Sequence, residues 1–224
     1  MPGFCQLFKS FRGFRGHNVF TADWYQVNEE IPMKSLIALL LGAVVYHASV
    51  LAAEPESQVD ASRATAAEFM KTLKGELMQA MQAGGPVNAI GVCKIRAPAI
   101  AAELGEREGW QVGRTSLKPR NLANAPDEWE RARLENFEQR KQAGEDPAQI
   151  EYYAVVEQDG QPVFRYMKAI PTAQLCLVCH GEKIDSAVEA KLTELYPRDQ
   201  ARGYKAGDIR GAFTFIEPLS PSVD

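Results

Sequence analysis

The chain has 224 residues, of which 46% are hydrophobic and 24% charged, and its formal net charge is −4. This is the composition of an ordinary globular protein, and the length suits one domain with an appendage. Because the chain has no basic surplus to neutralise phosphates, the composition argues against nucleic acid as a partner.

The segment 33–53 has the pattern of a secretory signal peptide. A positive start is followed by the apolar run SLIALLLGAVV and by small residues near Ala53. The alternative is an uncleaved membrane anchor, although His47 and Ser49 interrupt the apolar stretch. We favour cleavage and therefore expect an exported, periplasmic protein that meets the membrane only if the signal is retained.

Residues 1–32 precede this signal and are basic and aromatic. They either lie on a membrane surface or reflect a start codon assigned too early, with Met33 the true start, and we favour the second interpretation. The mature chain is then one domain, 54–224, in which His180 is the only histidine. Three cysteines remain in it: Cys93, Cys176 and Cys179.

Two helices are predicted at the start of this domain. Apolar residues at four-residue spacing predict a helix over 57–83, which Gly84-Gly85 ends. A second helix is expected over 86–104, with Cys93 on its apolar face. Pro98 lies inside this helix and should kink it one turn after the cysteine.

The remaining elements alternate between strands and helices. In chain order the pattern predicts strand 109–116, helix 126–144, strands 150–157 and 162–170 around the turn QDGQ, helix 185–195 and strand 208–217. The fold class is therefore α+β, with N-terminal helices and an antiparallel sheet that carries inserted helices.

The stretch QLCLVCHG, residues 174–181, carries the strongest chemical signal. In Cys-x-x-Cys-His, one short turn spaces two thiols to meet the two vinyl groups of a haem, and the adjacent histidine turns toward the iron. Cys176 and Cys179 would attach one covalent haem c, and His180 would bind its iron. The motif is more specific in an exported protein, because this attachment is usually made outside the cytoplasm.

Three other interpretations compete with haem. A structural zinc would use Cys93 with the three motif residues, but adjacent Cys-His donors are unusual for tetrahedral zinc and a second spaced pair is missing. A thiol oxidoreductase would need its Cys-x-x-Cys within a βαβ unit, and no parallel strand is apparent. A plain disulfide would leave His180 and Cys93 unexplained. We favour haem attachment.

The second axial ligand is open on the residues alone. Cys93 is one candidate, beside lysines, an open coordination site and four methionines at core-like positions: Met70, Met78, Met81 and Met167. Three basic residues are candidates for the haem propionates: Arg114, Lys118 and Arg120. Four aromatic residues are candidates for the pocket lining: Tyr152, Tyr153, Phe164 and Tyr166. Solvated surface charge and plain core packing are the alternatives for these two sets.

Four segments together, AIGVCKIRAPAIA, GRTSLKPRNLANAPDEWE, CLVCHG and YPRDQARGYKAGDIRGAF, resemble a bacterial family of PAS-like domains that carry a c-type haem. The resemblance spans about 65–218. It implies a PAS-like sheet with one covalent haem, Cys176 and Cys179 at the attachment positions and His180 as proximal ligand. It also implies that Cys93 is the other axial ligand, a thiolate that favours ferric iron.

Two functions follow from this interpretation. The first is a redox or gas sensor that signals to an unidentified periplasmic or membrane partner protein. The second is a periplasmic electron-transfer cytochrome. An enzyme is not expected, because two axial ligands leave the iron no free site and no acid–base pair is evident beside it.

Overall fold

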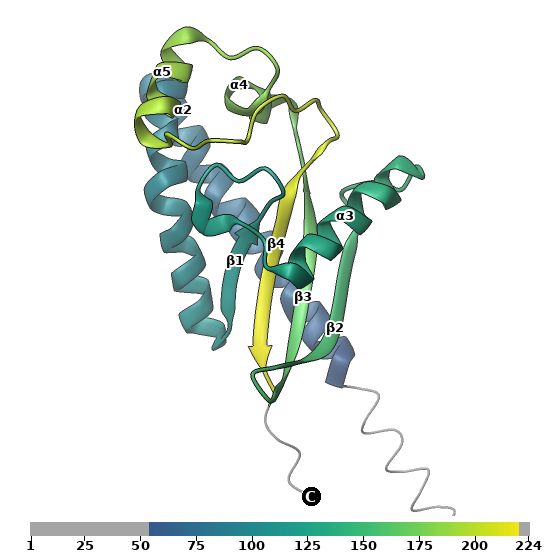
Figure 1. Ribbon diagram of the computed structural model, residues 1–224. Helices are drawn as coiled ribbons and strands as arrows, with labels where there is room; N and C mark the ends of the chain where they lie inside the picture. The colour runs from purple at the N-terminus through teal and green to yellow at the C-terminus, as the bar shows by residue number, and fades with distance from the viewer. Residues whose placement is uncertain (1–53, 220–224) are drawn as a thin grey trace, which may run out of the picture. The chain divides into compact units, whose positions relative to one another are not determined.

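The computed structural model describes residues 54–219, which form helices and one four-stranded antiparallel sheet (Figure 1). The predicted α+β class is therefore confirmed, and the arrangement is consistent with a PAS-like domain. The expected signal peptide at 33–53 and the extension at 1–32 lie outside the described residues. Among the described helices, none is long and apolar enough to cross a membrane.

The helix α2, Glu54–Glu108, consists of two helical halves separated at a glycine pair. Gly85 has φ 69° and ψ −169°, a conformation that essentially only glycine adopts. This confirms the two predicted helices, and the second extends four residues further than expected. Non-helical angles within α2 occur at Gly84 and Gly85, so the helix continues past Pro98 without interruption.

The sheet has the strand order β1-β4-β3-β2, with all neighbours antiparallel. Its strands are β1 (Gln111–Thr115), β2 (Glu151–Gln158), β3 (Gln161–Pro171) and β4 (Ile209–Pro218). Positive φ angles at Asp159 and Gly160 form the tight turn of the predicted hairpin between β2 and β3. The last strand of the chain thus lies between β1 and β3.

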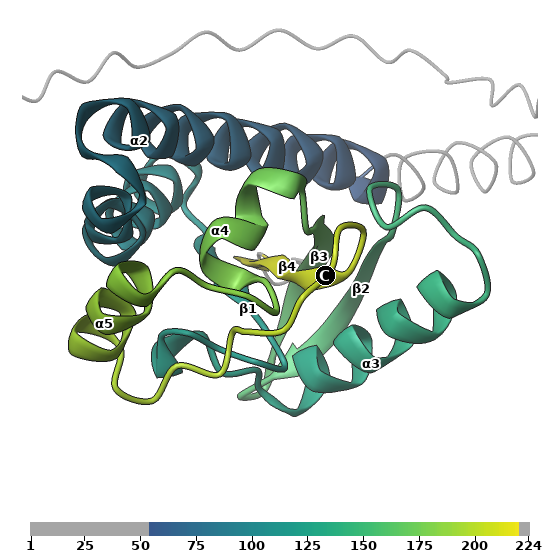
Figure 2. The ribbon, with the colours of Figure 1, turned by 90° about the horizontal axis from the view of Figure 1, so that it is seen from above.

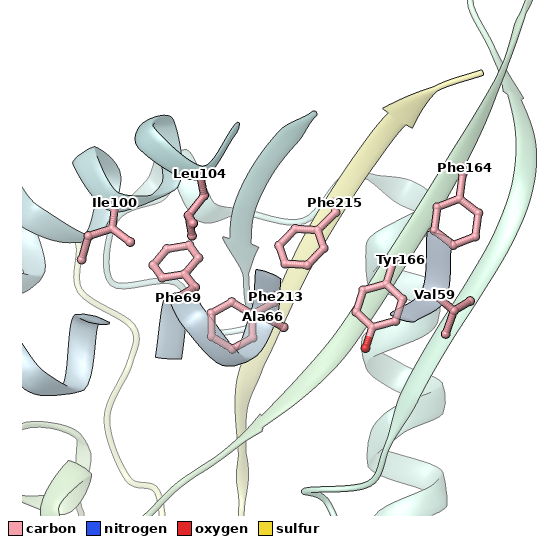
Figure 3. Packing of buried hydrophobic residues seen from close by; sticks show 9 residues of the cluster. All are labelled: Val59, Ala66, Phe69, Ile100, Leu104, Phe164, Tyr166, Phe213 and Phe215. Carbon is pink, nitrogen blue, oxygen red and sulfur yellow. The ribbon is translucent and has the colours of Figure 1, made fainter. Parts of the chain in front are cut away.

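One face of the sheet packs against α2 (Figures 1 and 2). Side chains from both halves of α2 meet alternate residues of β3 and β4 in a row of apolar contacts (Figure 3). This cluster comprises Val59, Ala66, Phe69, Ile100, Leu104, Phe164, Tyr166, Phe213 and Phe215. Because side chains alternate along a strand, the intervening residues face the other side.

The other face packs against α3, Glu128–Gln142. A capping box starts this helix: the Asp127 side chain accepts from the Glu130 backbone N–H, and the Glu130 side chain accepts from the Asp127 N–H. The buried residues between α3 and the sheet are Leu134, Phe137, Ile150, Met167, Ala169, Ile209 and Ala212.

Shorter elements complete the domain, one after β1 and three after β3. They are η1 (Leu122–Asn124), η2 (Gln174–Cys176), α4 (Leu177–His180) and α5 (Ser186–Leu195). Helix α5 packs on the second half of α2 through Ile90, Val188, Leu192 and Tyr196. Figures 1 and 2 show α4 at the end of the sheet, near α2 and α5. The Cys-x-x-Cys-His segment is thereby placed beside the second half of α2.

Candidate functional site

The Cys-x-x-Cys-His segment forms two consecutive short helical turns, η2 and α4. Gly181 ends them, with its N–H donating to the Leu177 carbonyl at 2.9 Å. A Cβ at Gly181 would lie 2.6 Å from that carbonyl oxygen, so a larger residue would displace the turn. Cys176 and Cys179 are both free thiols, so the described structure does not contain the disulfide that was one sequence-based alternative.

The imidazole of His180 is held through its Nδ1 atom. Nδ1 lies 2.9 Å from the Ala201 carbonyl oxygen. A carbonyl only accepts, so this hydrogen bond requires the proton on Nδ1 and leaves the lone pair of Nε2 free. Burial, with the positive charges of Arg210 and Arg120, holds the pKa of His180 well below its usual value. The imidazole is therefore neutral near pH 7, which is the form that binds a metal.

A buried ion pair fixes the backbone around this histidine. Arg120 Nε lies 3.1 Å from Asp199 Oδ1, and the two side chains are 8% and 1% exposed. Arg120 Nη2 also donates to the carbonyls of Cys179 and Ala201. The guanidinium of Arg120, a sequence-based candidate for propionate binding, is therefore occupied by protein partners.

Cys93 comes to this site from α2. Burial raises the pKa of its thiol, whereas the positive charges of Arg114, Arg120 and Arg210 lower it, and Cys176 raises it again. The pKa of Cys179 is in turn raised by burial and, among other charges, by Cys93. The fold therefore brings Cys93 within electrostatic reach of the Cys-x-x-Cys-His segment, more than 80 residues later in the chain.

Arg114 lies close to this group and carries a buried positive charge. It lies on β1 opposite Phe213, on the face toward α2, with its guanidinium 5.5 Å from the ring of Phe69. Burial lowers its pKa, an effect that Cys93 and Tyr196 oppose. Within residues 54–219 the guanidinium has no hydrogen-bond or ion-pair partner. It is therefore free to pair with a carboxylate from a ligand.

Arg210 was not predicted from the sequence, although it lies in one of the four quoted segments. Its Nε is 3.1 Å from His180 Nδ1, and its Nη1 is 3.1 Å from Ser116 Oγ. Arg114, Arg120 and Arg210 thus place three positive charges around the site. Asp199 pairs with Arg120 and acts on Arg210. This surplus suits a ligand with two carboxylates.

The remaining sequence candidates take other positions. Lys118 Nζ donates to the Arg202 carbonyl at 2.7 Å. Met167 is fully buried on the α3 face, and Met70 packs beside the core on the α2 face. Met78 is 37% exposed. Met81 is half-buried in the first half of α2. Cys93 is the candidate sulfur whose thiol interacts electrostatically with the motif cysteines.

The aromatic candidates for a pocket lining belong to the core or the surface. Phe164 and Tyr166 lie in the cluster under α2, and Tyr152 packs beside Trp129 on the α3 face. Tyr153 is 45% exposed. The alternation along the two strands accounts for this division, because neighbouring residues face opposite sides of the sheet.

The donor set does not suit a structural zinc ion. Among the described residues, no group of three His, Cys, Asp or Glu side chains lies close enough together to hold a metal ion. Four-coordinate structural zinc needs four such donors around one point. An iron with one protein ligand on each side needs only two, provided that another group supplies its remaining ligands.

Comparison with known proteins gives two matches. A family model described as Tll0287-like matches residues 46–218. The crystal structure of the cyanobacterial haem-protein Tll0287 is similar with a TM-score of 0.57 and 21% identity, over 75% of this chain and 98% of that chain. At this identity the likeness establishes a shared fold. No curated protein matches the chain.

Proposed function

The chain belongs to the Tll0287-like family, and from this membership we propose that it is a haem protein with one haem attached covalently to Cys176 and Cys179. The family match covers the region in which the sequence resembles PAS-like haem domains, and the similar solved structure is that of a haem protein. The observation that carries the proposal is the motif itself: two free thiols on consecutive short helical turns, followed by a histidine whose Nδ1 lies 2.9 Å from the Ala201 carbonyl oxygen.

The axial ligands in this proposal are His180 Nε2 and Cys93 Sγ. A bound haem would supply one-electron redox chemistry at this site. Cys93 comes from α2, whereas the histidine comes from the turn after β3. The two residues that would hold the iron therefore come from separate elements of the fold.

Arg114 would suit the carboxylates of such a ligand. Its guanidinium is without a protein partner and lies near Cys93, and Arg210 adds a second positive charge beside His180. Guanidinium groups pair with carboxylates through two parallel hydrogen bonds. We therefore assign Arg114 as the first candidate to hold a haem propionate, in place of Arg120.

We further propose that the protein works as a redox or gas sensor. The supporting observation is the position of Cys93 on α2, the helix whose Ile100 and Leu104 pack in the main core. A change in the bond between Cys93 and iron would act directly on this helix. An electron-transfer cytochrome, the alternative from the sequence, predicts a moderate potential and fast self-exchange instead.

Export through the segment 33–53 and action on a periplasmic or membrane partner belong to the same proposal, and both rest on the sequence. Export agrees with covalent haem attachment, which is usually made outside the cytoplasm. We expect no enzymatic turnover, because His180 and Cys93 would occupy both axial positions.

The test is expression of the full chain together with cytochrome c maturation machinery, followed by the spectrum in alkaline pyridine. We expect the signature of a c-type haem with two thioether bonds. A variant with Cys176→Ser and Cys179→Ser should lose the covalent haem, whereas Cys93→Ala, the matched control, should keep it. Colourless wild-type protein from a host that matures other cytochromes would contradict the proposal.

A further inference from the structure

We propose that the buried ion pair of Arg120 and Asp199 selects the imidazole tautomer of His180 that can bind iron, and that Arg210 favours the other tautomer. The inference rests on the proposed function of His180 as an iron ligand. It assigns Arg120 and Asp199 as positioning residues that act on the histidine before any haem is bound.

Two neighbours of His180 Nδ1 require different protonation states of this atom. The Ala201 carbonyl, at 2.9 Å, requires a proton on Nδ1. Arg210 Nε, at 3.1 Å, is a permanent donor and requires a lone pair on the same atom. One nitrogen cannot satisfy both. The contact with Ala201 leaves Nε2 able to ligate, whereas the contact with Arg210 places the proton on Nε2 and prevents ligation.

The position of the Ala201 carbonyl is set by the ion pair. Arg120 Nη2 donates to this carbonyl at 3.2 Å, and Asp199 Oδ1 accepts from the Ala201 N–H at 2.9 Å. Asp199 also lies 3.2 Å from Arg202 Nε, so the backbone from 199 to 202 is held on both sides. Because Arg120 reaches the Cys179 carbonyl too, one guanidinium fixes both the histidine and its acceptor.

Arg210 does not depend on His180 for its own hydrogen bonds. Its Nη1 has the Ser116 hydroxyl at 3.1 Å and the Lys118 carbonyl at 3.4 Å. It therefore stays beside the imidazole in either tautomer. If the Ala201 carbonyl moves away, Arg210 becomes the dominant neighbour of Nδ1, and the tautomer that cannot ligate gains population.

The test uses the full-length haem-free chain with ¹⁵N-labelled histidine. Nitrogen chemical shifts distinguish a protonated from an unprotonated ring nitrogen, and the His180 signals are those that disappear in His180→Ala. In the wild type we expect a protonated Nδ1. Since a hydrogen bond contributes on the order of 1 kcal/mol, Asp199→Asn and Arg120→Lys should each lower the ratio of the two tautomers about threefold to tenfold.

Arg210→Gln should shift the same ratio in the opposite direction, toward protonated Nδ1. General destabilisation of the fold would not shift the ratio in this opposite direction. The Arg210→Gln variant therefore still tests the inference if one of the other variants folds poorly. Glu76→Gln serves as control, because it breaks the ion pair between Glu76 and Arg96 on α2 and should leave the tautomers unchanged.

The inference would be overturned if Asp199→Asn and Arg120→Lys both kept the wild-type tautomer ratio. It would also be overturned if Arg210→Gln changed that ratio in the same direction as these two variants. The proposed function fails in a different way. Wild-type protein with protonated Nδ1 that takes up no haem during maturation would contradict haem binding, and the tautomer measurements would stand.

Discussion

At the scale of single residues, the positive charge of Arg114, which has no protein partner among the described residues, would have a measurable consequence for a bound iron. A positive charge near the metal opposes the extra positive charge of the ferric state. At an effective dielectric constant of about 20, two unit charges about 8 Å apart interact by roughly 2 kcal/mol. That energy corresponds to several tens of millivolts for a one-electron couple.

We therefore expect Arg114→Gln to lower the reduction potential of the haem-loaded protein by several tens of millivolts, measured by spectroelectrochemical titration. Arg107→Gln is the control, because Arg107 is exposed and pairs with Glu68 at the surface, where solvent screens its charge. Equal potentials in the Arg114 and Arg107 variants would show that Arg114 does not act on the iron.

At the scale of elements, the glycine pair in α2 determines where Cys93 lies. The first half of the helix packs along the sheet, and the break at Gly84-Gly85 allows the second half to pack against α5 as well. An unbroken helix of this length would be straight or gently curved and would carry Cys93 away from the Cys-x-x-Cys-His turn.

Gly85→Ala should therefore destabilise the protein by about 1–3 kcal/mol, since its backbone angles are accessible essentially only to glycine. Urea unfolding followed by circular dichroism measures this difference. Gly75→Ala in the first half of α2 is the matched control. A Cβ there meets no atom within 4 Å, so alanine should stabilise the helix by about 0.5–1 kcal/mol. A neutral Gly85→Ala variant would mean that the break tolerates other backbone conformations.

The elements themselves were predictable from the sequence because their signals are local. Gly84-Gly85 ended the first helix where the pattern placed the end, and QDGQ formed the predicted hairpin turn between β2 and β3. The short helical turn over 177–180 also matches the expected spacing of the two motif cysteines.

At the scale of the whole molecule, long-range pairing was not predictable. The position of β4 between β1 and β3 joins residues about 100 positions apart, and no turn signal encodes it. The ion pair of Arg120 and Asp199 spans 79 positions. Its existence could not be predicted from the sequence, which is why Arg120 was a candidate for propionate binding. Arg210 was missed for the same reason, because its contact with His180 depends on the register of β4.

The nearness of Cys93 to the motif is likewise a property of the whole fold. Periodicity placed the cysteine on the inner face of its helix, and the family resemblance gave it a role as ligand. The structure adds that α2, β1 and the motif turn carry Cys93, Arg114 and His180 into one electrostatically coupled group. That convergence is the basis for our proposal that His180 and Cys93 would both bind a haem iron.

The most direct test of this claim is the optical spectrum of the haem-loaded protein, ferric and then dithionite-reduced, for the wild type, Cys93→Ala and Met70→Leu. We predict thiolate ligation in the ferric wild type, its loss in Cys93→Ala, and an unchanged spectrum in Met70→Leu. Identical ferric and reduced spectra of wild type and Cys93→Ala would contradict the assignment of Cys93 as an iron ligand.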